Sequence, residues 1–152
     1  MYIFEKSILI NCSVKDAFEF HSDTNNLSKI SPGNIKVSIL KLELPLRKGS
    51  GIDLKIKQFG IFTSVWKLRI KNFEPFRLIT DELISGPFKY WEHDHIFSEK
   101  DEKTLMTDKV RYELPLGAFS NMAHSVFVKR MIESQFDSRQ IKTREILEKN
   151  NI

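Results

Sequence analysis

The sequence is poor in cysteine, which cross-links small secreted domains, and in glycine and proline, which interrupt regular structure. Its 152 residues include one cysteine, Cys12, with six glycines and five prolines. A single cysteine cannot form an intramolecular disulfide, so the disulfide framework of a small secreted domain is excluded. We therefore expect a chain that folds around a hydrophobic core in a reducing compartment, and we place it in the cytoplasm.

Long apolar runs and blocks of like charge are also missing. No stretch reaches the roughly 18 consecutive apolar residues of a transmembrane helix, and Glu5 and Lys6 interrupt the apolar start in a way that is not typical of a signal peptide. The 24 lysines and arginines are spread among 20 acidic residues, whereas a nucleic-acid-binding surface needs clustered basic residues. We expect neither a membrane span nor a nucleic-acid partner.

Apolar and aromatic residues are present in quantity. Hydrophobic residues make up 41% of the chain, charged residues 29%, and there are 12 phenylalanines. A chain of this length buries roughly 70% of the surface that its unfolded state exposes. The composition predicts one domain over residues 1–152 with an aromatic-rich core.

The start of the chain predicts a strand followed by two short helices. Residues 2–10 are mostly apolar and include β-branched members, as strands do. Ser13, with an aspartate three positions later, is the signal of a helix start and predicts a helix over 14–21. Asp23 and Thr24 can cap a second short helix that runs through Ile30 and ends there, because Pro32 cannot continue it.

The middle of the chain changes to the alternation of apolar and polar residues that strands show. Turn-forming residues separate the alternating segments. The expected strands cover about 35–40, 52–57, 64–71, 77–83, 88–98 and 104–113. This order predicts an antiparallel sheet with one face exposed to solvent.

The last part of the chain has a helical period for about thirty residues after Gly117. The expected apolar stripe comprises Phe119, Met122, Ala123, Val126, Phe127, Val128, Met131, Ile132, Phe136, Arg139, Thr143 and Ile146. A long helix with a broad apolar face must cover a sheet or a partner. We expect it to lie in the concavity of the sheet and to leave a pocket there.

The order strand, two short helices, six strands and long helix resembles the START-like helix-grip superfamily, also called SRPBCC. The segments that carry the resemblance are Trp66, Asp81-Glu82, Gly86-Pro87-Phe88, the run from Trp91 to Phe97, the run from Thr104 to Tyr112, and Pro115-Leu116-Gly117. They are similar to a bacterial subgroup of ligand-binding proteins, some of which are called cell division inhibitors.

The resemblance implies an α+β fold in which a curved antiparallel sheet of about seven strands surrounds the C-terminal helix. It also implies a deep cavity for a lipid-like, aromatic or polyketide-like molecule. It implies no particular reaction, because the superfamily includes carriers, sensors and enzymes, and a fold does not determine function.

Alternation along two neighbouring strands selects the residues of the expected pocket. His93 and His95 share a face with two aromatic residues of their strand, and Asp108 shares a face with apolar residues of the next strand, so we expect Asp108 to meet a histidine. The expected pocket comprises Trp66, Trp91, His93, His95, Phe97, Met106, Asp108, Tyr112, Phe127, Met131 and Arg139.

The polar group in this pocket has three interpretations. His93, His95 and Asp108 could form a metal triad, could act as a general acid and base, or could form a hydrogen-bonded network that satisfies itself. We favour the last and assign no metal, no cofactor and no catalytic residue. Arg139, on the stripe of the helix, either anchors a ligand carboxylate or phosphate or pairs with an acid, for which Asp81, Glu82 and Asp108 are the candidates.

The leading hypothesis is a protein that binds or carries a small hydrophobic molecule. One alternative is an enzyme of cyclase, dehydratase or hydrolase type that uses His93 or His95 with Asp108. Another is an interaction module whose long helix binds a partner or a second copy of the chain, which would give a homodimer. The identity of the ligand does not follow from the sequence.

Overall fold

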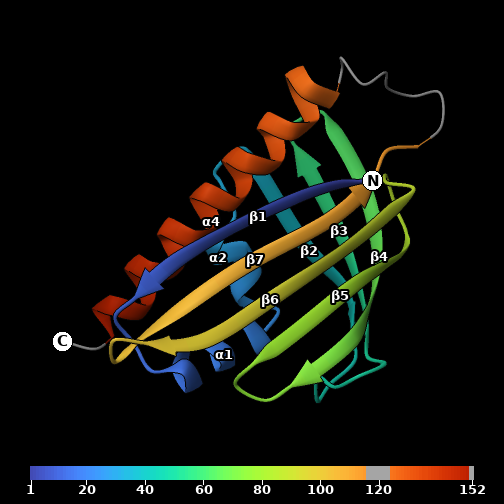
Figure 1. The fold of residues 1–152 in the computed structure, drawn as a ribbon. Helices are drawn as coiled ribbons and strands as arrows, with labels where there is room; N and C mark the ends of the chain where they lie inside the picture. The colour runs from blue at the N-terminus through green and yellow to red at the C-terminus, as the bar shows by residue number, and fades with distance from the viewer. Residues whose placement is uncertain (116–123, 151–152) are drawn as a thin grey trace.

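The computed structural model describes residues 1–115 and 124–150, and Figure 1 shows how their helices and strands are arranged. In chain order the elements are β1 (Tyr2–Ile10), α1 (Val14–Ser22), α2 (Asn26–Ile30), β2 (Ile35–Leu42), β3 (Gly51–Gln58), β4 (Phe62–Glu74), β5 (Leu78–Ser85), β6 (Tyr90–Lys100), β7 (Lys103–Glu113), the π-helical turn η1 (His124–Val128) and α4 (Lys129–Lys149).

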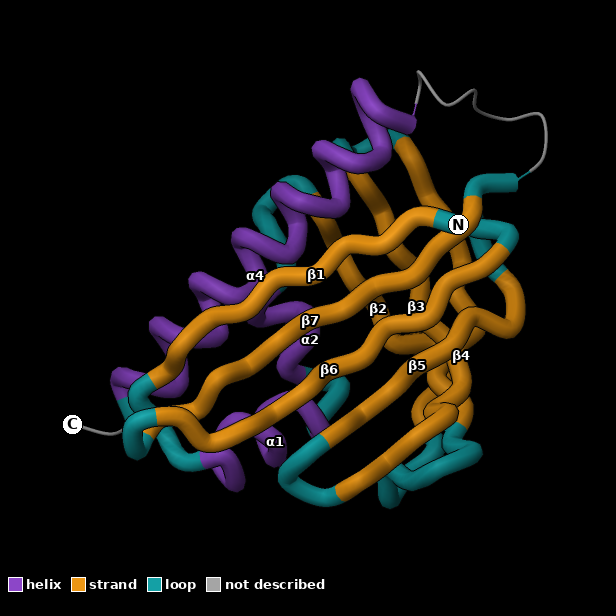
Figure 2. Tube along the Cα trace, viewed as in Figure 1, coloured by secondary structure: helices purple, strands orange, loops and turns teal. Residues whose placement is uncertain are grey.

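The described strands form one antiparallel sheet in the order β1-β7-β6-β5-β4-β3-β2. Figure 2 shows the sheet curving so that β1, β7 and β6 lie in front of β2 and β3. Register shifts occur in β2 and at two places between β4 and β5, and such irregularities increase strand bending. The predicted α+β fold with seven strands is confirmed.

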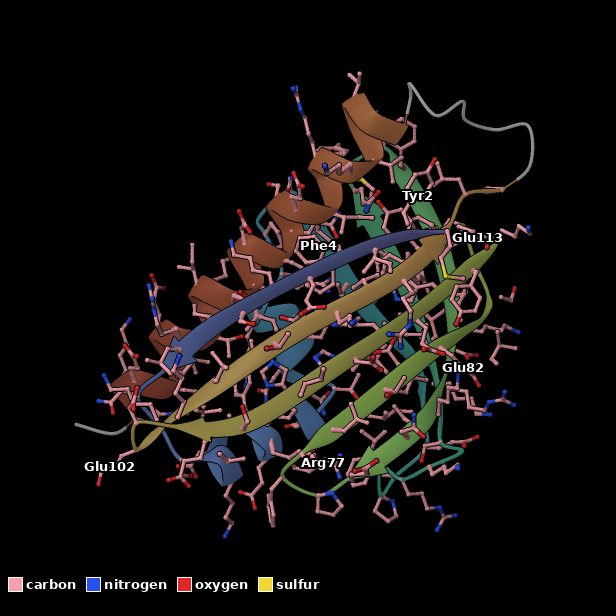
Figure 3. All side chains as sticks on the ribbon, viewed as in Figure 1. Tyr2, Phe4, Arg77, Glu82, Glu102 and Glu113 are labelled. Carbon is pink, nitrogen blue, oxygen red and sulfur yellow. The ribbon has the colours of Figure 1, made fainter. Side chains whose placement is uncertain are left out.

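The helices cover the concave side of the sheet. Helix α1 contacts β6 and β7, α2 contacts β2 and α4, and α4 contacts β1. Figure 3 shows side chains filling the space between α4 and β1, where the rings of Phe4 and Phe136 lie 5.2 Å apart. The interior is therefore closed on one side by strands and on the other by helices.

The two short helices begin for local reasons. The Ser13 hydroxyl accepts a hydrogen bond from the backbone N–H of Asp16 at 3.0 Å, which confirms the predicted cap of α1. Helix α2 begins at Asn26, shortly after the predicted cap residues Asp23 and Thr24. The Asp23 carboxylate accepts a hydrogen bond from the backbone N–H of Asn25 at 3.0 Å, which stabilises the turn that leads into the helix.

The long helix buries a slightly different stripe from the predicted one. Its buried residues are Ile132, Phe136, Gln140, Thr143 and Leu147. The predicted residues Arg139 and Ile146 are partly buried, and Arg139 faces the interior. Gln140 and Leu147 are buried although the prediction left them out, whereas the predicted Val126 and Phe127 are exposed. The predicted helical residues Phe119, Met122 and Ala123 lie outside the described residues.

The strands that carry the expected pocket bury the predicted faces. In β7, Met106, Asp108, Val110 and Tyr112 are all less than 5% exposed, as alternation requires. In β6, Trp91 and Phe97 are buried on the inner face. None of the described helices is long and apolar enough to cross a membrane.

Candidate functional site

Polar side chains gather on the inner face of three neighbouring strands. In the sheet register Asp81 of β5 lies opposite His93 of β6, and His95 of β6 lies opposite Asp108 of β7. Because alternate residues of a strand point to the same face, all four side chains meet beneath the helices. Paired strands hold their backbone positions rigidly.

Asp108 is the buried centre of this group. Its Oδ1 atom lies 2.8 Å from His93 Nε2 and 3.2 Å from His95 Nδ1. Its Oδ2 atom accepts a hydrogen bond from Gln140 Nε2 at 2.8 Å, and the same amide donates to the backbone oxygen of Lys6. A carboxylate only accepts, so His93 carries its proton on Nε2. The predicted meeting of Asp108 with a histidine is therefore found.

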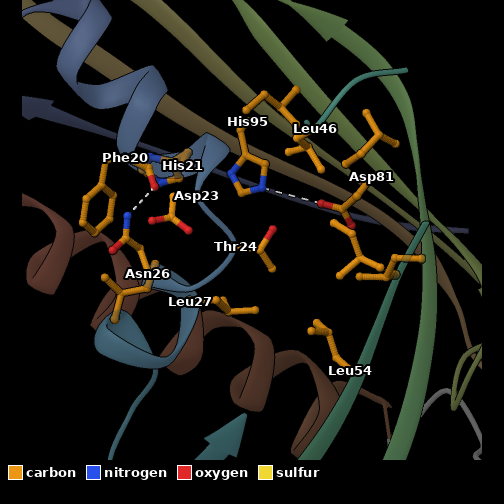
Figure 4. Close-up of a pocket in the computed structure, with 15 residues that line it drawn as sticks. Phe20, His21, Asp23, Thr24, Asn26, Leu27, Leu46, Leu54, Asp81 and His95 are labelled. Carbon is orange, nitrogen blue, oxygen red and sulfur yellow. Dashed lines mark hydrogen bonds and ion pairs between the residues drawn. The ribbon is translucent and has the colours of Figure 1, made fainter. Parts of the chain in front are cut away.

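Asp81 lies on the other side of the two histidines. Its Oδ2 atom is 3.6 Å from His93 Nδ1 and 3.6 Å from His95 Nε2. Figure 4 shows the Asp81 carboxylate and the His95 ring pointing toward one another across the wall of a cavity. Each histidine is thus placed between two carboxylates.

The charges in this group follow from burial and from the two carboxylates. Burial disfavours a charge on His95, but Asp108 and Asp81 outweigh it and raise the pKa of His95 to about 9. Burial, and then the neighbouring His95, lowers the pKa of His93. Burial would raise the pKa of Asp108, but its hydrogen bonds to the histidines hold that pKa well below its usual value.

A third histidine, His21 of α1, borders the same group. Its ring centroid lies 5.3 Å from that of His95, and its Nδ1 atom is 2.9 Å from the backbone oxygen of Ala17. Burial, together with the positive charge of His95, lowers the pKa of His21 to about 4. His21 is therefore neutral at neutral pH.

Arg139 reaches the group from α4 without a direct ion pair. No carboxylate in the described part of the chain lies within 4.0 Å of its guanidinium, and its buried Nε atom has no hydrogen-bond partner there. Its Cζ atom stands 5.3 Å from the ring centre of Phe136. Burial lowers the pKa of Arg139, but a guanidinium stays charged. None of the three candidate acids, Asp81, Glu82 and Asp108, forms an ion pair with Arg139 in the described part of the chain, and Glu82 binds Arg69 instead.

Three small cavities surround the polar group. One, of about 100 Å³, lies beside α1 and α2, and another, of about 120 Å³, lies beside α4; Asp81 and His95 line both. A third, of about 30 Å³, is bordered by Asp108, Gln140 and Thr143. We call these three the inner cavities.

A larger and mainly apolar pocket, which we call the outer pocket, lies at the end of the sheet near η1. Its volume is about 480 Å³, within the range of natural ligand sites. Its apolar lining includes Phe59, Phe62, Phe88, Leu114, Phe127 and Met131. Trp66 and Gln58 line both the outer pocket and the inner cavity beside α4, so the two spaces share a wall.

The expected pocket residues fall into five places. Trp66, Trp91, His93, His95 and Arg139 line the inner cavity beside α4, Met106 and Asp108 line the smallest cavity, and Phe127 and Met131 line the outer pocket with Trp66. Phe97 packs in the core against Phe18. Tyr112 is buried beside Trp91 and borders a separate space between β1 and α4.

Several residues of this site were not selected from the sequence. Asp81 alternates with Ile79 and Leu83 in β5, so its inward direction was detectable from the same pattern that selected His93. Gln140 and His21 gave no such signal. A glutamine on a helix is more often exposed, and only packing against β7 shows that Gln140 is buried.

The sequence matches a known family over most of its length. Residues 10–136 match the family described as polyketide cyclase / dehydrase and lipid transport. None of the curated proteins matches the sequence significantly.

Solved structures with the same fold have little sequence in common with this chain. A START superfamily protein from Mycobacterium smegmatis is 15% identical, with a TM-score of 0.73 and coverage of 98% of this chain and 99% of that one. The major latex-like protein 151 of Panax ginseng is 15% identical, with a TM-score of 0.72 and coverage of 96% and 97%. The di-domain ARO/CYC StfQ of the steffimycin biosynthetic pathway is 9% identical, with a TM-score of 0.79 and coverage of 98% and 51%.

Proposed function

The chain belongs to the polyketide cyclase / dehydrase and lipid transport family, and from this premise we propose that it binds a small hydrophobic molecule with a polar end. The observation that supports this most is that Trp66 lines both the apolar outer pocket and the inner cavity beside α4, and that Arg139 lines this inner cavity. The apolar body occupies the outer pocket, and the polar end points inward.

Arg139 is the residue suited to receive the polar end. Its Nε–H is buried without a partner among the described residues, and a buried donor without an acceptor costs about 1–3 kcal/mol. A carboxylate or phosphate oxygen of the ligand would satisfy that donor and would gain a charged hydrogen bond. This favours acidic amphiphiles over neutral ones.

The apolar half of the proposal is tested with the fluorescent probe N-phenyl-1-naphthylamine. We expect the wild-type protein to bind it and Met131→Arg to weaken binding more than roughly tenfold, because a charge would enter an apolar pocket. Val126→Arg is the matched control, since Val126 is 60% exposed and does not line the outer pocket. Equal loss in both variants, or no binding by the wild type, contradicts the proposal.

The polar half is tested by comparing decanoate with decanol as competitors of the probe. In Arg139→Met we expect the affinity for decanoate to fall roughly tenfold or more, which is the scale of one charged hydrogen bond. The affinity for decanol should not change. A parallel loss for both competitors would remove Arg139 from the role of anchor.

The two alternatives stay predictions. Catalysis by His93 or His95 with Asp108 requires a substrate in reach of those side chains, and association through α4 requires a second chain. The hydrogen bond between His93 and Asp108 and the family description, which includes cyclase and dehydrase, favour the first of these predictions over the second.

A further inference from the structure

The inner face of β5 and β6 carries a set of atoms that the proposed function does not use. One ligand atom from each of Asp81, His93 and His95 lies within 4.8 Å of the other two. The three residues come from two hydrogen-bonded strands, with Asp81 directly opposite His93. Such strands hold side chains in a fixed arrangement, which a binding site for an ion requires.

The distances within the set fit a shared ion better than a hydrogen bond. Asp81 Oδ2 is 3.6 Å from both His93 Nδ1 and His95 Nε2, which is too long for a normal hydrogen bond. Two ligands bound to one zinc ion at 2.0–2.1 Å in tetrahedral geometry are about 3.3–3.4 Å apart. Both distances from the Asp81 carboxylate are therefore within a few tenths of an ångström of the separation expected around one ion.

The far sides of both histidines face one carboxylate. His93 Nε2 is hydrogen-bonded to Asp108 at 2.8 Å. His95 Nδ1 lies 3.2 Å from the same oxygen but makes no hydrogen bond in the described part of the chain, so the nitrogens nearest Asp81 are the ones left for an ion. Gln140 in turn holds Asp108. A histidine that binds a metal through one nitrogen and a carboxylate through the other is the usual arrangement at metal sites.

We propose that Asp81, His93 and His95 bind one divalent first-row transition-metal ion, with Asp108 and Gln140 as positioning residues. Two imidazoles and one carboxylate suit zinc, iron or cobalt rather than calcium or magnesium. The two inner cavities lined by Asp81 and His95 supply an entry path and leave a coordination position open to a small oxygen ligand. This departs from the sequence analysis, which assigned no metal. The metal triad considered there used Asp108 as the third ligand, whereas here Asp81 takes that place.

The test uses the full chain after treatment with EDTA. Titration with zinc chloride in a calorimeter is expected to show one ion per chain, and cobalt(II) is expected to give visible absorption bands that zinc abolishes. Asp81→Asn should weaken zinc binding more than roughly tenfold, the loss already seen when only an outer partner of a metal site is removed. His95→Gln should weaken it as well.

Asp94→Asn is the matched control for Asp81→Asn. Asp94 lies between the two histidines in the sequence, but its side chain binds Thr80 and Arg111 on the opposite face, so zinc affinity should stay at the wild-type value. Circular dichroism melts establish that each variant is folded. A folded wild-type protein that binds no zinc, or folded Asp81→Asn and Asp94→Asn variants that bind it equally, would overturn the proposal.

The metal site does not depend on the hydrophobic ligand. Zinc binding is measured without any apolar molecule, and the probe N-phenyl-1-naphthylamine is measured on the EDTA-treated protein. Met131→Arg is expected to lose the probe and to keep zinc, whereas Asp81→Asn is expected to lose zinc and to keep the probe. Each proposal therefore fails by its own measurement.

Discussion

At the scale of single residues, the site depends on polar groups buried in an apolar interior. Gln140 is 1% exposed and Asp108 is 4% exposed, and each holds the other in place by a hydrogen bond of 2.8 Å. Burying such groups is unfavourable unless their partners are present. The arrangement of the two histidines therefore rests on a glutamine that contacts neither of their rings by a hydrogen bond.

Replacing Gln140 should destabilise the protein even though the side chain is neutral. Gln140→Ala leaves Asp108 Oδ2 and the backbone oxygen of Lys6 without this donor. We therefore expect the free energy of unfolding to fall by about 2–4 kcal/mol relative to the wild type. Urea denaturation measures the change. The exposed Glu145→Ala serves as control and should stay within about 0.5 kcal/mol; a Gln140 variant that is equally mild would contradict this account of Asp108.

At the scale of elements, α4 stays on the sheet through one face. Its buried positions follow each other at intervals of three or four residues, as expected of a helix with one apolar face. Phe136 packs against Phe4 of β1 and against His93 of β6. The same face that holds the helix on the sheet thus forms a wall of the inner cavities.

Two isoleucines of α4 allow the contribution of that face to be measured. Ile132 is 3% exposed and Ile141 is 46% exposed. We expect Ile132→Ala to lower the free energy of unfolding by about 2–4 kcal/mol, because it leaves a cavity, and Ile141→Ala to change it by less than about 0.5 kcal/mol. Chemical denaturation of both variants provides the comparison, and similar losses would mean that α4 packs differently.

At the scale of the whole molecule, the sheet and the helices enclose two kinds of space with different chemistry. The outer pocket near η1 is mainly apolar, and the inner cavities are bordered by carboxylates, histidines and an arginine. Trp66 lines both the outer pocket and the inner cavity beside α4. Under our proposal, a molecule in the outer pocket that extends past the Trp66 ring reaches the polar side chains of this inner cavity. The proposal therefore predicts elongated ligands with one polar terminus.

A ligand bound in this interior should stabilise the whole domain. At a free concentration of 100 times Kd, binding to the folded state alone adds about 2.7 kcal/mol, which raises the Tm of a domain of this size by about 5–11 °C. Differential scanning calorimetry with N-phenyl-1-naphthylamine measures this shift. In Met131→Arg the shift should disappear. An unchanged Tm of the wild type at saturating probe would mean that the probe does not bind the folded state in preference to the unfolded state, which contradicts the proposal.

Much of the fold was predictable from local patterns. The alternation in residues 88–98 and 104–113 identified the inward faces of β6 and β7, and the cap at Ser13 located α1. The meeting of Asp108 with a histidine followed because neighbouring strands of a hairpin pair their inward residues. These features depend on interactions within a strand, a helix turn or one hairpin, so the sequence alone determined them.

The identity of the third residue beside the histidines was decided only by the tertiary structure. The alternation in β5 indicates that Asp81 points inward, but Asp81 reaches His93 because the register between β5 and β6 places them opposite one another. Gln140 is buried only because α4 packs at one particular rotation against β7. Register and helix rotation are set by the packing of the whole core, which no local pattern encodes, and they decide which polar groups share the interior.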